Sequence, residues 1–315
     1  MKHFLTETDF DQNEIIEVFE HASRFKKNRE NRPDSALSGQ SWGMLFYKNS
    51  TRTRISFEVG IRELGANPLI IDQSSTQIRR GESIEDTARV LSRYLDGLII
   101  RTHGHDIIEE FARHSSIPVV NALTDFLHPC QIYADCMTIL EKTGQGLNPF
   151  EGLRGKKLAF FGDTSCNMAN SWILAGALFG IEVHLAGPAD FQPRPEIKEF
   201  CQARGLPETW RHTQDPNEAS RDADVIYTDV WVSMGCEEQE HDRLLQMEPF
   251  RVTAETLAGA KENCLFMHCM PAHPGEEVAQ EVLHTPQAIL FDQAENRLHM
   301  QKSILRKISH FEKDA

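Results

Sequence analysis

The chain has no hydrophobic run long enough to cross a membrane. A spanning helix needs about 20 consecutive, mainly apolar residues, and no apolar segment here approaches that length. The N-terminus, residues 1–9, also lacks the apolar core of a secretory signal peptide. These absences predict a cytoplasmic protein with no membrane partner.

Basic residues are in the minority. The chain has 33 Lys and Arg residues against 47 Asp and Glu residues, which gives a net charge of -14 at pH 7. Because a nucleic-acid surface needs clustered positive charge, this composition argues against a nucleic-acid partner. Any anion site must be a local positive pocket in an acidic protein, which suits a small anionic ligand.

The cysteines form no C-x-x-C pair, and their number, seven, is odd. A disulfide scaffold is therefore not expected. His268 and Cys269 could be drawn with His273 as a metal site, but no second ligand pair follows at zinc-finger spacing. We expect no structural metal.

Signatures of several common enzyme classes are missing as well. The chain has no G-x-S-x-G elbow, no G-x-x-x-x-G-K-[ST] loop and no carboxylate cluster suited to magnesium. These absences argue against phosphoryl transfer from a nucleotide. Gly162 follows a strand-like segment but lacks the G-x-x-G that lets a backbone approach a pyrophosphate closely. A nicotinamide cofactor is not expected, and the sequence predicts no other cofactor.

What the chain does contain is an alternation of strand-like and helix-like segments. Its 315 residues, 40% of them apolar, can fill two cores of ordinary size. The alternation predicts an α/β fold with two domains, each a mainly parallel sheet flanked by helices. Turn-forming residues gather at 142–149, so we place the domain boundary there, between residues 1–145 and 146–296.

The expected segments follow from apolar runs and helical spacing. Strands are predicted at 42–47, 68–71, 98–100, 117–120, 157–161, 181–186, 224–228, 263–267 and 288–291. Helices are predicted at 13–27, 53–64 and 196–203, and further helices are expected to begin after Ser83, at Pro129 and near 293–297.

The stretch 46–58 has the clearest functional pattern. A buried strand is expected to end near Tyr47, and the sequence Ser50-Thr51-Arg52-Thr53-Arg54 follows where a helix begins. A helix start presents unpaired N–H groups and the positive end of its dipole, to which these hydroxyl and guanidinium groups add. Phosphate is the ligand that this pattern favours. The alternative is a helix cap in which Ser50 or Thr51 satisfies the first turn and the arginines are solvated.

Further polar residues follow other predicted strands. Arg101 ends one strand, His128 and Gln131 flank a helix start, and Asp229 follows a strand of the second half. The carboxyl ends of parallel strands converge at the edge where open α/β sheets bind ligands. Each residue also has an alternative without a binding role. Arg101 could be exposed on the surface, His128 could have a structural role, and Asp229 could bond to the local backbone of a turn.

Together these groups favour one kind of reaction. A phosphate cradle, a further arginine and histidine, and an acid that could hold an amino-acid substrate fit an amine that attacks an acyl phosphate. Fixed positive charge would stabilise the oxyanion while phosphate departs.

Five segments resemble the signature motifs of the ornithine carbamoyltransferases, within the aspartate/ornithine carbamoyltransferase family. They occur in the family's order and are Ser50-Thr51-Arg52-Thr53-Arg54, His128-Pro129-Cys130-Gln131, Asp229-Val230-Trp231-Val232-Ser233-Met234-Gly235, His268-Cys269-Met270-Pro271 and Ala294-Glu295-Asn296-Arg297. The chain departs from the family pattern at Asn49, Cys166 and Met270. The resemblance implies transfer of the carbamoyl group from carbamoyl phosphate to the δ-amino group of L-ornithine, giving L-citrulline and phosphate.

The resemblance also implies a role for each matching residue. The residues that would bind carbamoyl phosphate are Ser50, Thr51, Arg52, Thr53, Gln77, Arg101, His128, Gln131, Cys269, Met270 and Arg297. Those that would bind ornithine are Asn167, Asp229, Ser233 and Met234. The residues with catalytic roles would be Arg101, His128, Asp229 and Cys269. In this reading the amine attacks directly, without an acyl-enzyme on the cysteine.

The resemblance assigns the two domains as well. Residues 1–145 would bind carbamoyl phosphate and 146–296 would bind ornithine. A C-terminal helix at about 297–315 would pack back on the first domain. The family further implies a homotrimer in which Gln77 reaches the neighbouring subunit's site, and domain closure once carbamoyl phosphate has bound. From composition alone, the loop 72–83 that carries Gln77 would be a solvated connection.

Two kinds of alternative stay open. Within the family, the aspartate, putrescine and acylated-ornithine enzymes differ in their motifs, and Ser233-Met234-Gly235 is the feature that favours ornithine. The alternative from another class is a catalytically silent anion-binding protein that has kept the fold. It would bind carbamoyl phosphate without forming citrulline.

Overall fold

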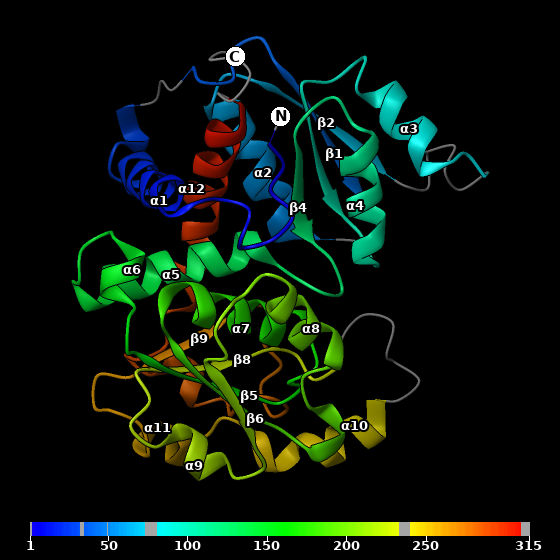
Figure 1. Cartoon of the computed structure of the whole chain (residues 1–315). Helices are drawn as coiled ribbons and strands as arrows, with labels where there is room; N and C mark the ends of the chain where they lie inside the picture. Colours follow the sequence, from blue (N-terminus) through cyan, green and yellow to red (C-terminus); the bar gives the residue numbers. More distant parts are fainter. Residues whose placement is uncertain (1, 32–34, 49, 73–80, 233–239, 310–315) are drawn as a thin grey trace. The chain divides into compact units, whose positions relative to one another are not determined.

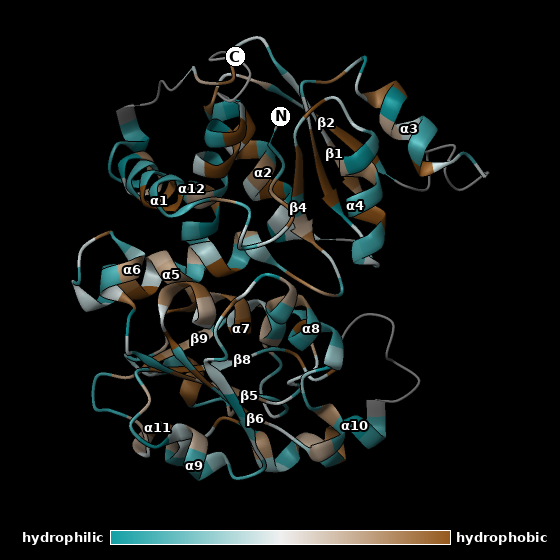
Figure 2. Ribbon diagram, in the orientation of Figure 1, coloured by the Kyte–Doolittle hydropathy of each residue, from teal (hydrophilic) through white to brown (hydrophobic). Residues whose placement is uncertain are grey.

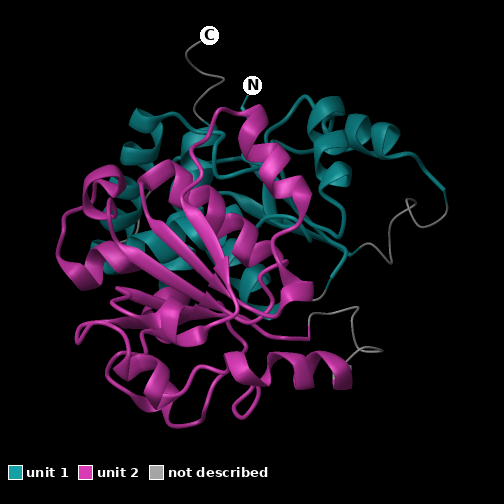
Figure 3. Cartoon of the chain, turned by 60° about the horizontal axis from the view of Figure 1, so that its bottom comes forward, with its two compact units in different colours: residues 1–137, 295–315 teal, residues 138–294 magenta. Residues whose placement is uncertain are grey.

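The computed structural model describes residues 2–31, 35–48, 50–72, 81–232 and 240–309 (Figure 1). The chain divides into two compact units. Unit 1 comprises residues 1–137 and 295–315, and unit 2 comprises residues 138–294 (Figure 3). Each unit holds one parallel β-sheet with helices around it, so the predicted α/β fold with two parallel sheets is confirmed.

The sheet of unit 1 has four strands in the order β2-β1-β3-β4, all parallel. Its strands are β1 (Ser41–Phe46), β2 (Asn67–Asp72), β3 (Gly97–Arg101) and β4 (Val119–Leu123). Its helices are α1 (Gln12–Lys27), α2 (Thr51–Glu63), α3 (Ile84–Leu91), α4 (His105–His114), most of α5 (Pro129–Thr143) and most of α12 (Leu290–Ser309). The strands of this sheet are mainly brown, that is hydrophobic, in Figure 2.

Polar caps begin the helices where the sequence predicted them. Ser50 precedes α2, and its side chain accepts a hydrogen bond from the backbone N–H of Thr53. Ser83 precedes α3 and accepts from the N–H of Asp86 at 3.0 Å. Each cap satisfies a backbone donor that the first helical turn leaves unpaired.

The C-terminal helix α12 belongs largely to unit 1. The Ser303 hydroxyl donates to the carbonyl of Val18 on α1 at 2.6 Å. Lys302 forms an ion pair with Glu63 of α2 at 2.9 Å, and both side chains are almost completely buried. The predicted packing of the C-terminal helix on the N-terminal part of the chain is therefore confirmed.

The sheet of unit 2 has five strands in the order β7-β6-β5-β8-β9, also all parallel. Its strands are β5 (Lys157–Phe161), β6 (Glu182–Ala186), β7 (Trp210–Thr213), β8 (Val225–Thr228) and β9 (Leu265–His268). Its helices are α6 (Pro149–Gly152), α7 (Asn167–Phe179), α8 (Pro195–Ala203), α9 (Pro216–Ser220), α10 (Glu240–Met247) and α11 (Ala254–Ala258).

The register of the strands sets the functional edge of unit 2. Phe161 of β5 pairs with Thr228 of β8, and Thr228 pairs with His268 of β9. The three strands therefore end side by side, and the residues that follow them begin at one edge of the sheet.

One expected strand is wrong, and one observed strand was not predicted. The segment 288–291 is not a strand: Ala288 makes one isolated bridge to Phe266, and α12 begins at Leu290. The same finding moves the start of the terminal helix, expected near 293–297, to Leu290. The edge strand β7 was not predicted, because its short sequence, Trp210-Arg211-His212-Thr213, has little apolar character.

Among the described helices, none combines the length and the low polarity that a bilayer span would require.

Candidate functional site

Two arginine side chains from distant parts of unit 1 converge on one hydroxyl group. Thr53 lies in the first turn of α2 and is fully buried. Its Oγ1 accepts from Nη2 of Arg297 at 2.7 Å and from Nη1 of Arg101 at 3.4 Å. Two guanidinium groups at a helix N-terminus supply the local positive charge that an anion site requires.

The local fold explains how these groups meet. Arg101 is the last residue of β3 and pairs with Phe46 at the end of β1, directly before the turn into α2. Arg101 is only 9% exposed, so the alternative of a surface arginine is wrong. Ser50 does cap α2, as the alternative for this stretch proposed. Its cap leaves the exposed Thr51 and Arg52 of the first turn accessible to a ligand.

His128 is a neutral imidazole in this environment. It directly precedes α5 and is 4% exposed. Burial lowers the pKa of His128 well below its ordinary value, and the positive charges of Arg297 and Arg101 lower it further. A neutral imidazole can donate one hydrogen bond without adding a charge, which suits polarisation of a carbonyl oxygen.

Gln131 has a fixed amide orientation. Its Nε2 donates to Oδ1 of Asp135, one helical turn later on α5, at 2.8 Å. Because a carboxylate accepts and does not donate, the Gln131 carbonyl oxygen must face away from Asp135. That oxygen, Oε1, is buried without a hydrogen-bond partner. It is therefore a ready acceptor for an N–H group such as the one a carbamoyl group carries.

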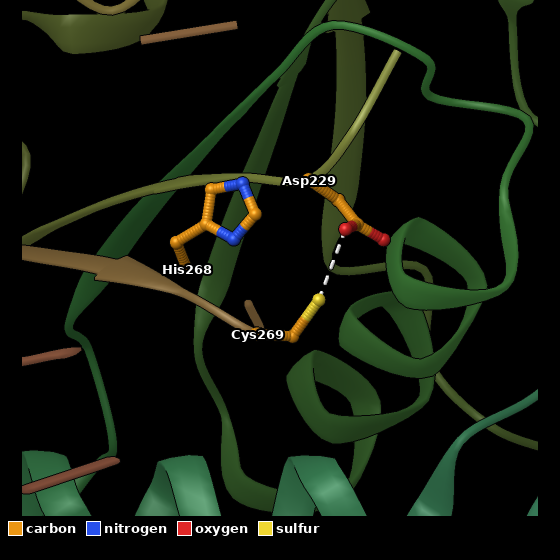
Figure 4. Close-up of side chains that lie close together, drawn as sticks. All are labelled: Asp229, His268 and Cys269. Atoms are coloured by element: carbon orange, nitrogen blue, oxygen red, sulfur yellow. Dashed lines mark hydrogen bonds between the residues drawn. The ribbon is translucent and has the colours of Figure 1, made fainter. Parts of the chain in front are cut away.

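In unit 2, Asp229 and Cys269 lie side by side at the ends of β8 and β9. The Cys269 thiol donates to Oδ1 of Asp229 at 3.0 Å (Figure 4). The same oxygen accepts from the N–H of Val230 at 2.8 Å, so the local turn considered as an alternative is present too. Burial raises the pKa of the Asp229 carboxyl, while the hydrogen bonds from Cys269 and Val230 act in the opposite direction.

Asp229, His268 and Cys269 also form one of two groups, in the described part of the chain, whose potential metal-ligand atoms lie within 4.8 Å of one another. The other group is His273, Glu276 and Glu277. Both nitrogens of His268 already bond to protein: Nδ1 accepts from the N–H of Met270, and Nε2 lies 3.1 Å from Glu277. A metal ion at His268 would have to displace one of these bonds.

Asn167 and Cys166 lie at the start of α7, where Cys166 is the N-cap residue and Asn167 the first helical residue. Burial raises the pKa of the Cys166 thiol well above its ordinary value, and the negative charges of Asp163 and Asp229 add to that effect. The thiol is therefore protonated at neutral pH and is no nucleophile.

The strand end at β5 is held by an arginine from α10. Arg243 forms an ion pair with Asp163 and donates through Nε to the carbonyl of Trp231 at 3.0 Å. Gly162 has a φ of +108°, and a Cβ atom there would lie 2.6 Å from Nε1 of Trp231. Only glycine fits this position, so its role is close packing rather than dinucleotide binding.

Three predicted site residues, Gln77, Ser233 and Met234, lie outside the described residues. The structure adds two residues that the sequence reasoning missed, Asp135 and Glu277. The position of Asp135 four residues after Gln131 on a helix was a usable signal, since such residues are neighbours on the helix surface. The sequence offered no such signal for Glu277, because it does not distinguish Glu277 from the adjacent Glu276.

Known proteins resemble the chain over nearly its whole length. Residues 2–141 match the family model "Aspartate/ornithine carbamoyltransferase, carbamoyl-P binding domain", and residues 154–308 match "Aspartate/ornithine carbamoyltransferase, Asp/Orn binding domain". The chain is 44% identical to an ornithine carbamoyltransferase of Geobacter sulfurreducens, over 98% of this chain and 99% of that protein. It is 46% identical to one of Methanoculleus marisnigri, over 98% and 96% of the two chains.

The fold of the chain is also similar to that of a solved structure. The ornithine carbamoyltransferase from Pyrococcus furiosus superimposes with a TM-score of 0.89 at 40% sequence identity, covering 98% of this chain and 97% of that one. Two domain models and full-length relatives thus point to the same assignment, and the chain belongs to the aspartate/ornithine carbamoyltransferase family of enzymes.

Proposed function

We propose that this enzyme is an ornithine carbamoyltransferase, which transfers the carbamoyl group of carbamoyl phosphate to the δ-amino group of L-ornithine and releases L-citrulline and phosphate. The observation that carries the proposal is the convergence of Arg101 and Arg297 on Thr53 at the start of α2. The names of the relatives at 44% and 46% identity favour ornithine over the other amines.

The groups of unit 1 would hold the acyl phosphate. The first turn of α2, with Ser50, Thr51, Arg52 and Thr53, would bind the phosphate, and Arg297 would complete that anion pocket. Arg101 and His128 would donate to the carbonyl oxygen and stabilise the negative charge that develops there. The free carbonyl oxygen of Gln131 would accept from the carbamoyl nitrogen.

The groups of unit 2 would hold the amine substrate. Asp229 and Asn167 would bind ornithine, together with Ser233 and Met234, and Cys269 would lie near the attacking nitrogen. A backbone carbonyl of the Cys269–Met270 turn would also accept from the carbamoyl nitrogen. The amine must be neutral to attack, and the departing phosphate would accept its proton. This scheme needs no covalent enzyme intermediate.

We further propose the domain roles and assembly that the sequence suggested: carbamoyl phosphate on the first domain, ornithine on the second, and a homotrimer completed by Gln77. A cyclic trimer would show as a particle of about three times the mass of one chain. Light scattering after size-exclusion chromatography measures that mass, and a monomer at micromolar concentration would contradict it. The cytoplasmic location stays a prediction.

A substrate panel tests the proposed activity. Purified enzyme and carbamoyl phosphate are incubated separately with ornithine, putrescine, aspartate and N-acetylornithine, and the release of phosphate and the carbamoylated product are measured. We expect the highest kcat/KM with ornithine. A higher value with another amine would replace the substrate assignment, and binding of carbamoyl phosphate without any turnover would favour a silent anion-binding protein.

A further inference from the structure

Glu277 is a completely buried carboxylate that bonds to both ends of one turn. The turn runs from His268, at the end of β9, to His273. Oε1 of Glu277 lies 3.1 Å from Nε2 of His268 and 2.5 Å from the backbone N of His273. Both Glu277 and His268 have no exposed surface. One acceptor atom thus connects the first and last residues of the turn.

The bonds of His268 determine which of its nitrogens carries hydrogen. The backbone N–H of Met270 donates to Nδ1 of His268 at 2.8 Å, so Nδ1 carries no hydrogen. In a neutral imidazole the hydrogen must then lie on Nε2, from which it is donated to Glu277. The carboxylate of Glu277 therefore selects the tautomer in which Nδ1 can accept from Met270.

The bond to Met270 matters because Met270 has an unfavourable backbone conformation. Its φ is +60°, in the left-handed region that residues other than glycine seldom adopt. Such a conformation persists only where surrounding contacts enforce it. Next to it, the thiol of Cys269 is directed at Asp229. The shape of this turn therefore sets where the Cys269 and Met270 backbone carbonyls and the Cys269 thiol point.

A second side chain bonds to the backbone of His268. The side chain of Gln293 accepts from the backbone N–H of His268 at 3.0 Å and donates to the Tyr227 hydroxyl at 3.2 Å. The backbone of His268 is thus fixed independently of Glu277. What remains for Glu277 to determine is the imidazole ring and the turn that follows it.

We propose that Glu277 is a positioning residue, which fixes the tautomer of His268 and thereby holds the Cys269–Met270 turn in the shape that receives the carbamoyl group. The inference rests on the proposed function, because it assigns that turn to the carbamoyl nitrogen. Glu277 itself contacts no substrate and acts through His268.

The neighbouring Glu276 provides a matched control. It pairs with His273 at 3.5 Å, but its side chain is 36% exposed and that of His273 is 46% exposed. The two glutamates are adjacent, equally charged and each paired with a histidine. Only Glu277 is linked to His268.

The test compares Glu277→Ala, Glu277→Gln and Glu276→Ala in the ornithine assay. We expect Glu277→Ala to lower kcat by roughly tenfold to a hundredfold, the scale of a small misplacement of reacting groups. Glu277→Gln keeps an acceptor oxygen and should recover most of that loss. Glu276→Ala should match the unaltered enzyme. Inhibition by inorganic phosphate, which would bind to unit 1, should not change in any variant.

The outcomes separate the two proposals. If the unaltered enzyme fails to carbamoylate ornithine, the proposed function fails. If that enzyme is active and folded Glu277→Ala keeps its kcat, the inference about Glu277 fails alone. A lower melting temperature with unchanged kcat below that temperature would likewise reduce Glu277 to a structural role and overturn the inference.

Two substitutions at His268 keep the test decisive if Glu277→Ala does not fold. The amide of His268→Asn can replace Nδ1 and accept from Met270, whereas the amide of His268→Gln can replace Nε2 and donate to Glu277. We expect His268→Asn to have a kcat at least about tenfold higher than His268→Gln, because it retains the bond to the turn. Equal kcat values would overturn the inference.

Discussion

Single residues of this protein have functions that depend on partners far away in the sequence. Arg297 reaches Thr53 across 244 positions, and Arg101 reaches it across 48. The sequence could place Arg101 at a strand end and Thr53 at a helix start, because local patterns determine both. Burial and the shared hydroxyl could not be predicted locally, since they arise only when α12 packs on α1 and α2. The motif resemblance named Arg297, but the structure shows what it contacts.

Arg52→Ala tests the anion pocket at the level of one side chain. Arg52 is exposed in the first turn of α2, and the proposed role is to bind the phosphate. We expect kcat/KM to fall about 100- to 1,000-fold, or roughly 3 to 4 kcal/mol of transition-state stabilisation, the scale of removing one donor that stabilises an oxyanion. Steady-state kinetics with both substrates measures the change.

Arg62→Ala is the control on the same helix. Arg62 is exposed and forms a surface ion pair with Glu58 at 3.3 Å, and such pairs contribute little to stability. We expect its kcat/KM to equal that of the unaltered enzyme. Similar losses in the two variants would mean that general charge, and not the position of Arg52, supports activity.

At the scale of elements, the spacing of apolar residues predicted strands and helices well where it fitted only one of the two. The prediction was wrong at 288–291, because a short apolar run fits either a strand or a helix start. The structure shows why it is helical: Leu290 is 5% exposed and adjacent Phe291 is 83% exposed, so only one face of this run is buried. The spacing also missed strand β7. This strand forms through backbone pairing with β6, and its polar side chains do not indicate it.

Helix α5 shows how an element can orient a side chain. Gln131 and Asp135 lie four residues apart, and their hydrogen bond fixes the amide of Gln131. In Asp135→Ala we expect the amide to rotate freely and kcat/KM to fall about tenfold or more, the scale of one oriented hydrogen bond in a buried site. Asp135→Asn can still offer an acceptor oxygen and should retain most of the activity.

Glu141→Ala, which removes another carboxylate from α5, is the control for that experiment and should leave kcat/KM unchanged. We expect kcat/KM to be higher for Asp135→Asn than for Asp135→Ala. If Asp135→Ala is folded and fully active, the orientation of Gln131 does not matter to the reaction.

For the whole molecule, buried histidines link stability to pH. Burial lowers the pKa of five histidines: His3, His128, His184, His212 and His299. Folding keeps these groups neutral, whereas in the unfolded chain they bind protons near pH 6.5. Below that pH these histidines bind more protons in the unfolded state than in the folded state, so their contribution to the free energy of unfolding decreases as the pH falls.

The variant His128→Gln measures how much one such histidine contributes to the pH dependence of the free energy of unfolding. For a histidine that stays neutral, the free energy of unfolding falls by up to about 1.4 kcal/mol for each pH unit below the unfolded pKa. Replacing His128 should remove that contribution, so the variant should lose less stability than the unaltered protein between about pH 6.5 and 5.5. The exposed His284 is the control, and His284→Gln should keep the original slope. Urea unfolding at several pH values gives these slopes, and equal slopes for all three proteins would show that His128 accepts a proton while folded, contrary to a neutral role beside Arg101 and Arg297.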